Sequence, residues 1–81
     1  MELYAIFRHP EAGCDEDTED VKQAGFVVGE RYRVAHLWVG TWRSFVELVG
    51  FDGDFNSAHF LFVDRDGNEV NVYTDPKYRY F

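Results

Sequence analysis

The sequence is poor in cysteine and proline, and it contains no long hydrophobic run. Its single cysteine, Cys14, cannot form an intrachain disulfide, which is typical of proteins of a reducing compartment. The first residues lack a basic stretch followed by an apolar run, so we expect no signal peptide. No segment approaches the roughly 18 apolar residues of a membrane-spanning helix. We therefore expect a protein of the cytoplasm, in a bacterium or an infected host cell, that does not contact a membrane.

Common catalytic and metal-binding motifs are also missing. There is no Gly-Lys-Ser/Thr phosphate loop, no HExxH and no GxSxG. The one cysteine and three histidines are scattered, whereas zinc sites usually take their four ligands in short paired spacings. Three acids follow Cys14 directly, and their charge disfavours a nucleophilic thiolate. We expect no enzymatic activity, no metal and no cofactor.

The negative charge of the chain is concentrated in one segment. Fifteen acidic and 8 basic residues give a formal net charge of −7. The acids that lie between residues 11 and 20, where no Lys or Arg occurs, are Glu11, Asp15, Glu16, Asp17, Glu19 and Asp20. The rest of the chain is close to neutral. Such a local concentration of charge can form a binding surface for a protein partner. It disfavours binding to nucleic acid, because the carboxylates repel the phosphates.

Alternation of apolar and polar residues predicts a small, mostly β protein. Strands are expected at about residues 3–7, 31–39, 45–48, 58–63 and 70–72, separated by turns that contain Gly and Asp. An acidic loop with a short helix is expected at about residues 9–25. The helix should begin near Asp17 or Thr18 and end before Gly25. The predicted fold class is a five-stranded antiparallel barrel with one short helix after the first strand, in a single domain of residues 1–81.

The alternation also predicts which side chains face inward. Hydrophobic residues make up 46% of the chain and aromatic residues 19%, which is enough for one core. The expected core consists of Leu3, Ala5, Phe7, Val34, Val46, Leu48, Ala58, Phe60, Phe62, Val70 and Val72. Fifteen aromatic side chains are more than a core of this size readily buries, so we expect some of them at the surface.

An aromatic patch is predicted around the bend at residues 40–41. It consists of Trp38, Trp42, Arg43 and Phe45. These side chains either close one end of the barrel or form a contact surface, because Trp, Tyr and Arg are frequent anchors of interfaces. A contact surface of this kind would suit a proline-rich peptide or a single-stranded nucleic acid.

Four segments together resemble a group of small bacterial and phage proteins. They are residues 28–32 (VGERY), 50–57 (GFDGDFNS), 58–62 and 73–78, which contains Asp75-Pro76. The resemblance extends from about Thr18 to the C-terminus and implies an SH3-like β-barrel. Its motifs are structural, so it implies an architecture and no particular chemistry.

Three roles are open for the acidic segment: a solvated loop, a surface that occupies a basic groove of another protein, or a calcium site, for which the EF-hand spacing is missing. Our hypothesis is a non-catalytic protein-binding module, a monomer or weak homodimer. It would act as a phage or mobile-element inhibitor whose acidic surface covers the basic, nucleic-acid-binding surface of a host defence protein such as a CRISPR-type nuclease. The alternatives are a small nucleic-acid- or peptide-binding barrel that uses the aromatic patch, and a structural subunit of a larger assembly.

Overall fold

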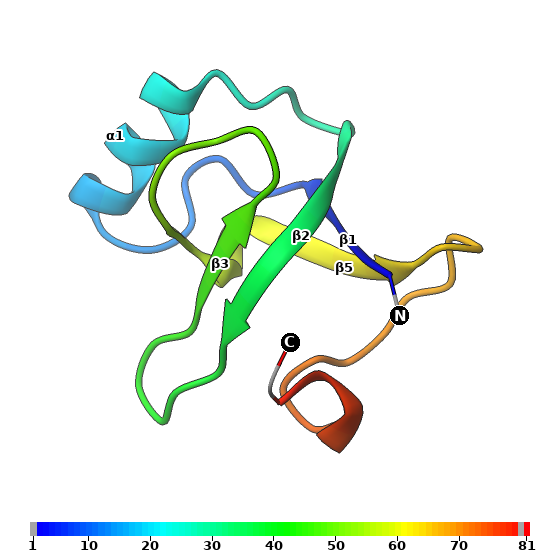
Figure 1. The fold of residues 1–81 in the computed structure, drawn as a ribbon. Coiled ribbons are helices and arrows are strands. Elements are labelled where there is room, and N and C mark those ends of the chain that lie inside the picture. Colours follow the sequence, from blue (N-terminus) through cyan, green and yellow to red (C-terminus); the bar gives the residue numbers. More distant parts are fainter. Residues whose placement is uncertain (1, 80) are drawn as a thin grey trace.

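The computed structural model describes residues 2–79 and 81 and is built around one antiparallel sheet (Figure 1). The strands are β1 (Leu3–Phe7), β2 (Arg31–Trp38), β3 (Phe45–Leu48), β4 (Phe55–Asn56) and β5 (Phe60–Asp64). Their order in the sheet is β4-β3-β2-β1-β5. Helix α1 (Asp15–Ala24) follows β1, and two short 3₁₀ turns, η1 (Ser57–His59) and η2 (Pro76–Tyr78), lie later in the chain. The prediction of a mostly β fold with five antiparallel strands and one helix after the first strand is confirmed.

The sheet curls into a half-barrel whose open side is covered by the C-terminal segment and not by a further strand. The expected strand at residues 70–72 is wrong. The sheet continues there as one isolated bridge between Val63 and Glu69. Two backbone hydrogen bonds flank it, one of 3.0 Å from the Val70 amide to the Phe62 carbonyl and one of 2.9 Å from the Asp64 amide to the Asn68 carbonyl. Asn71 then starts a turn, because its side-chain oxygen accepts a hydrogen bond of 3.1 Å from the Tyr73 amide.

The fifth strand is instead β4, at the opposite edge of the sheet, in a segment between the predicted turn at residues 50–54 and the predicted strand at 58–63. Phe55 pairs with Val46 of β3, and its side chain is only 6% exposed. After two residues the chain enters η1, where the Asn56 side chain accepts a hydrogen bond of 3.0 Å from the Ala58 amide. This turn leaves Ala58 exposed, so the prediction that Ala58 belongs to the core is wrong.

A β-bulge in β2 changes which side chains face the core. The register shifts between Val34, which pairs with Leu48, and His36, which pairs with Glu47. As a result Val34 and Leu37 both face inward, each 3% exposed, although strict alternation places them on opposite faces. Beyond the bulge, the outward side of β2 carries His36 and Trp38.

Helix α1 begins earlier than predicted and ends where predicted. Its first residue is Asp15, and Cys14 is the residue before it. Gly25 ends the helix with a φ of 79°, in the left-handed region that glycine adopts at least cost. The helix is anchored to the rest of the molecule by Val21, which is 2% exposed, and by Asp17, which is 8% exposed.

The centre of the core is an aromatic cluster around Phe26, a residue that the alternation of the strands does not identify. Phe26 follows the helix, and its ring centroid lies 4.6 to 5.6 Å from five other rings. These rings belong to Phe7, Tyr32, Phe51, Phe55 and Phe60. Phe26 thus joins the helix end, the sheet and the β3–β4 loop (residues 49–54) in one cluster.

Replacement of Phe26 by alanine should therefore destabilise the whole domain. We expect Phe26→Ala to lower the free energy of unfolding by about 3–5 kcal/mol, because a large buried ring is lost and a cavity is left. A chain of this length has a total stability of roughly 4–12 kcal/mol, so the variant should be close to unfolded. Urea unfolding followed by circular dichroism tests this, with Phe26→Leu as the milder control. A loss below about 1 kcal/mol would contradict the central place of Phe26.

Candidate functional site

Asp17, predicted on the acidic partner-binding surface, is turned into the molecule. Its Oδ2 atom accepts hydrogen bonds from the Cys14 amide at 3.1 Å, the Cys14 thiol at 3.2 Å and Asn56 Nδ2 at 3.1 Å. The same oxygen forms an ion pair with the Arg43 guanidinium. One carboxylate therefore joins the start of α1, the β2–β3 loop (residues 39–44) and β4. Its physical role is structural, because the charge is already compensated by Arg43.

The chain at Gly13 is shaped to admit this carboxylate. Gly13 has a φ of 79°, and a Cβ atom there would lie 2.6 Å from Asp17 Oδ2 and 3.0 Å from Asn56 Nδ2. Only glycine therefore fits between the end of the 8–12 segment and the helix. Burial acts to raise the pKa of the Asp17 carboxyl, but hydrogen bonds from Asn56 and Cys14, together with the charge of Arg43, hold this pKa below its ordinary value of 3.8.

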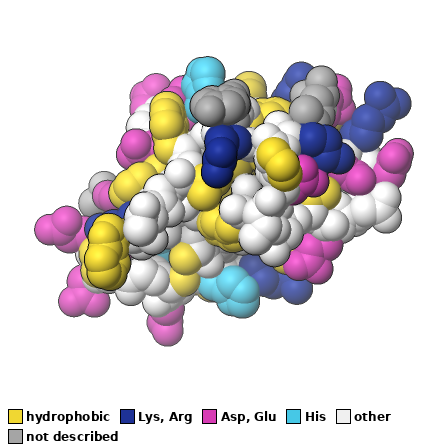
Figure 2. Space-filling model, turned by 90° about the horizontal axis from the view of Figure 1, so that it is seen from below, with side chains coloured by type: hydrophobic (Ala, Val, Ile, Leu, Met, Phe, Trp, Pro, Cys, Tyr) yellow, Lys and Arg dark blue, Asp and Glu magenta, His cyan; other side chains and the backbone are white. Residues whose placement is uncertain are grey.

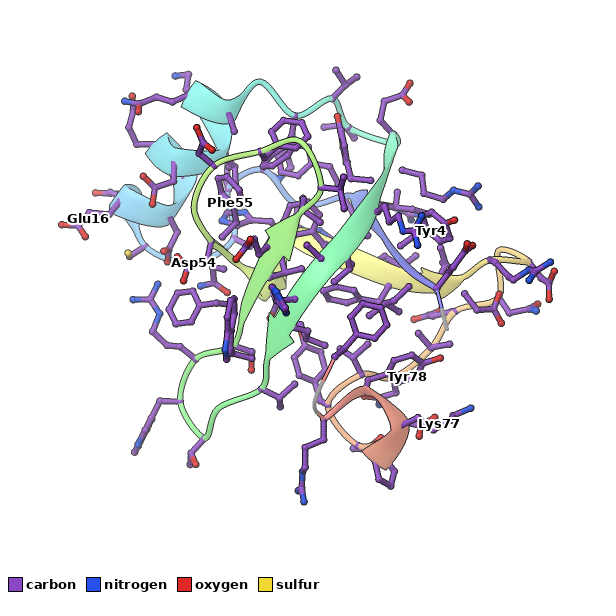
Figure 3. The ribbon with its side chains drawn as sticks, viewed as in Figure 1. Tyr4, Glu16, Asp54, Phe55, Lys77 and Tyr78 are labelled. Carbon is purple, nitrogen blue, oxygen red and sulfur yellow. The ribbon has the colours of Figure 1, made fainter. Side chains whose placement is uncertain are left out.

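The other five predicted acids are exposed: Glu11, Asp15, Glu16, Glu19 and Asp20. Four of them lie in α1 as two adjacent pairs, Asp15-Glu16 and Glu19-Asp20, which are four residues apart and therefore share one broad side of the helix. Figure 3 shows Glu16 pointing away from α1 into solvent. Acidic side chains also project from the left edge of the view from below, the side on which α1 lies in Figure 1 (Figure 2).

The fold adds two carboxylates that the sequence reading did not assign to any site. Asp52 and Asp54 are exposed in the β3–β4 loop, which lies beside α1 (Figure 3). Loop and helix enclose an open hollow of about 570 Å³, to which the loop contributes Asp52 and Asp54 and the helix contributes Asp20. None of the residues that line this hollow in the described structure is Lys or Arg. In the sequence, Asp52-Gly53-Asp54 predicts only a turn. The position of these two carboxylates beside α1 is evident only from the tertiary structure.

We call the six exposed carboxylates of α1 and the β3–β4 loop the acidic surface: Asp15, Glu16, Glu19, Asp20, Asp52 and Asp54. The only base in α1 is Lys22, which is exposed. It does not line the hollow between helix and loop. Instead Lys22 lines a smaller, more apolar hollow of about 320 Å³ on another side of the helix, together with Glu11 and Val28. Glu11, predicted with the other acids, therefore lies beside Lys22 and apart from the hollow of Asp20, Asp52 and Asp54. Among the described residues, no ion pair links Lys22 to an acid of α1.

The structure brings together three of the four residues of the predicted aromatic patch. Trp38 pairs across the strands with Phe45 and is 49% exposed. The Arg43 guanidinium lies 5.4 Å from the centroid of the Phe45 ring, besides its ion pair with Asp17. Trp42, at the tip of the β2–β3 loop, is 96% exposed. Arg43 is thus paired within the molecule, while the Trp42 side chain is almost fully exposed to solvent.

Two of the residue types that can bind a metal, His59 and Cys14, make hydrogen bonds within the fold. His59 is fully buried, and its Nδ1 atom lies 2.7 Å from the His9 carbonyl oxygen, so it fastens the start of the acidic segment to η1. Cys14 donates its thiol hydrogen bond to Asp17. Among residues 2–79 and 81, no group of three or more His, Cys, Asp or Glu side chains is arranged to hold a metal ion. The same residues contain no helix with the length and apolar character needed to cross a membrane.

Fold and surface define a small β protein with a half-barrel sheet and a localised acidic surface. The chain matches the family model described as bacteriophage T4 protein Y07B over residues 2–80, and it belongs to that family. This supports the predicted likeness to small phage proteins. No curated protein and no solved structure matches the chain, so the SH3-like part of the resemblance stays a prediction.

The position of Asp17 gives a test of its structural role. We expect Asp17→Asn to lower the free energy of unfolding at pH 7 by about 1–3 kcal/mol, because the ion pair and part of the hydrogen bonding are lost. Since the pKa of Asp17 is lowered in the folded state, its stabilising effect is complete above about pH 4 and is lost as the pH falls through that lowered pKa. The stability of the variant should therefore fall less on acidification than that of the wild type.

Urea unfolding between pH 7 and pH 2 measures both effects. Asp54→Asn is the matched control, because it makes the same chemical change at an exposed carboxylate. Asp64, whose pKa is lowered by hydrogen bonds from Asn68, is present in every variant and cancels in the comparison. Equal stability and equal acid sensitivity of Asp17→Asn and Asp54→Asn would contradict the structural role of Asp17.

Proposed function

We propose that this protein is a non-catalytic inhibitor of phage origin that binds a basic surface of a host protein through its acidic surface. The observation that carries this proposal is the convergence of six exposed carboxylates from α1 and the β3–β4 loop, of which Asp20, Asp52 and Asp54 line one hollow. Four of these acids lie in α1, and Asp52 and Asp54 come from the β3–β4 loop. If the acids served only solubility, they would not have to lie on one side of the molecule.

The charge density supports a nucleic-acid-binding surface as the target. The four exposed acids of α1 lie within six residues, or about 7.5 Å along the helix axis at 1.5 Å per residue. This corresponds to roughly one charge per 2.5 Å, which approaches the one charge per about 1.7 Å of duplex DNA. A groove that binds phosphates through Lys and Arg would therefore meet a comparable density of negative charge. Such a groove on a host defence nuclease is the target that we favour.

The arrangement of these acids is also well ordered. Asp17 and Arg43 fix the beginning of α1, and Val21 anchors its middle in the core. The acidic side chains are thus presented on a packed helix, so little backbone freedom is lost when they bind. Repulsion among the acids disfavours the free protein and is relieved by a basic partner, which adds to the driving force and speeds association.

The alternative use of the aromatic patch for nucleic acid is less well supported. Phosphate binding requires free cations, but Arg43 is paired with Asp17 and lies against Phe45. The ion pair also holds the loop against the first turn of α1, where the carboxylates of Asp15 and Glu16 are exposed. A single strand stacked on Trp42 would approach this negative side and be repelled by it.

The test compares two variants of equal net charge. The acidic-surface variant carries Glu16→Gln, Glu19→Gln and Asp20→Asn. The control variant carries Glu30→Gln, Asp66→Asn and Glu69→Gln, three exposed acids outside the acidic surface. Both changes remove three negative charges, so net charge cancels in the comparison and only the location of the charge differs.

Each protein is immobilised and used to capture proteins from a bacterial lysate at low and high salt. We expect nucleic-acid-binding proteins on the wild type and the control, with roughly tenfold less capture on the acidic-surface variant and on all three at high salt. Added wild-type protein should then displace DNA or RNA from the purified captured protein. Equal capture by the two variants, or capture without displacement of nucleic acid, would contradict the proposed function.

A further inference from the structure

Trp42 is an unusual surface residue. Its side chain is 96% exposed, while Trp38, at 49%, is partly covered by neighbours on the sheet. Tryptophan is highly buried on average, and exposed apolar side chains of this size often mark an interaction site.

The loop that carries Trp42 is held in one conformation from both sides. The Ser44 hydroxyl accepts a hydrogen bond of 3.1 Å from the Gly40 amide, and the Ser44 carbonyl accepts one of 2.9 Å from the Ser57 amide. A Cβ atom on Gly40 would lie 2.4 Å from the Arg43 carbonyl oxygen, so this close turn requires glycine. Arg43, next to Trp42, is fastened to Asp17. An exposed aromatic ring on a fixed loop is a preorganised anchor, which loses little entropy on binding.

The surroundings of the loop indicate what this anchor fits. The ion pair between Arg43 and Asp17 holds the loop against the first turn of α1, where Asp15 and Glu16 are exposed. Arg43 is already paired, so the unpaired charges of this helix turn are negative. A guanidinium group that approaches here meets carboxylates, and it can also lie flat on the indole ring, an arrangement that suits arginine better than lysine.

We propose that Trp42 is an anchor of the partner interface and receives an arginine side chain of the basic partner. This inference rests on the proposed function, because it assumes that the acidic surface faces the partner. It adds a second contact of different chemistry: the carboxylates attract the basic surface, and the indole ring distinguishes arginine from other cations. The interface then extends from α1 to the β2–β3 loop.

A nona-arginine peptide serves as the probe, with nona-lysine for comparison. Trp38→Phe is used as the background, so that Trp42 is the only tryptophan and its emission reports on the loop alone. We expect a saturable change of this emission with nona-arginine and a smaller change with nona-lysine. By calorimetry, Trp42→Ala should weaken binding of nona-arginine about five- to tenfold, whereas Val49→Ala, which truncates another exposed apolar side chain, should leave it unchanged.

The outcomes separate the two proposals. If nona-arginine binds Trp42→Ala as tightly as the wild type, the role of Trp42 is overturned, while weak binding to the variant with Glu16→Gln, Glu19→Gln and Asp20→Asn still supports the acidic surface. If that acidic-surface variant binds as tightly as the wild type, the proposed function fails. No binding of nona-arginine to the wild type would overturn both proposals.

Discussion

The buried carboxylate of Asp17 is the interaction on which the arrangement of this protein's surface depends. It joins three parts of the chain through Cys14, Asn56 and Arg43. Without it, the start of α1, the β2–β3 loop and β4 would have no common partner. The carboxylates of α1 and the ring of Trp42 owe their relative positions to this one side chain. A single acid in an acidic segment thus orders the rest of the segment.

The division of roles among the acids follows from solvation. A carboxylate can be buried at acceptable cost only when hydrogen bonds and an opposite charge replace its water, and Asp17 has both. Arg43 can compensate only one carboxylate here, so the neighbouring acids of α1 remain exposed to solvent. They stabilise the beginning of the helix through its dipole and repel one another. Their accumulation brings little to the stability of the fold, which is why we relate it to binding.

Much of the fold follows from local sequence patterns, and the parts that do not follow depend on tertiary contacts. Alternation identifies β1, β3 and β5, and Gly25 ends the helix as expected. The bulge after Val34 cannot be recognised from the alternation of apolar and polar residues. The strand β4 forms because the Phe55 side chain is buried in the core, which depends on tertiary contacts. At the site, the density of acids is visible in the sequence, but the inward turn of Asp17 and the approach of Asp52 and Asp54 to α1 are not. The spacing of three residues between Cys14 and Asp17, typical of a helix start, is the one local signal for Asp17.

The most direct test of this account is a double-mutant cycle between Asp17 and Arg43. The free energy of unfolding is measured at pH 7 for the wild type, Asp17→Asn, Arg43→Gln and the double variant. Because Arg43 is 47% exposed, solvent weakens the pair, and the account predicts a coupling energy of about 1 kcal/mol or somewhat more. Effects that add within about 0.3 kcal/mol would contradict it. They would mean that helix and loop are positioned independently, and that the acidic surface and Trp42 do not belong to one interface.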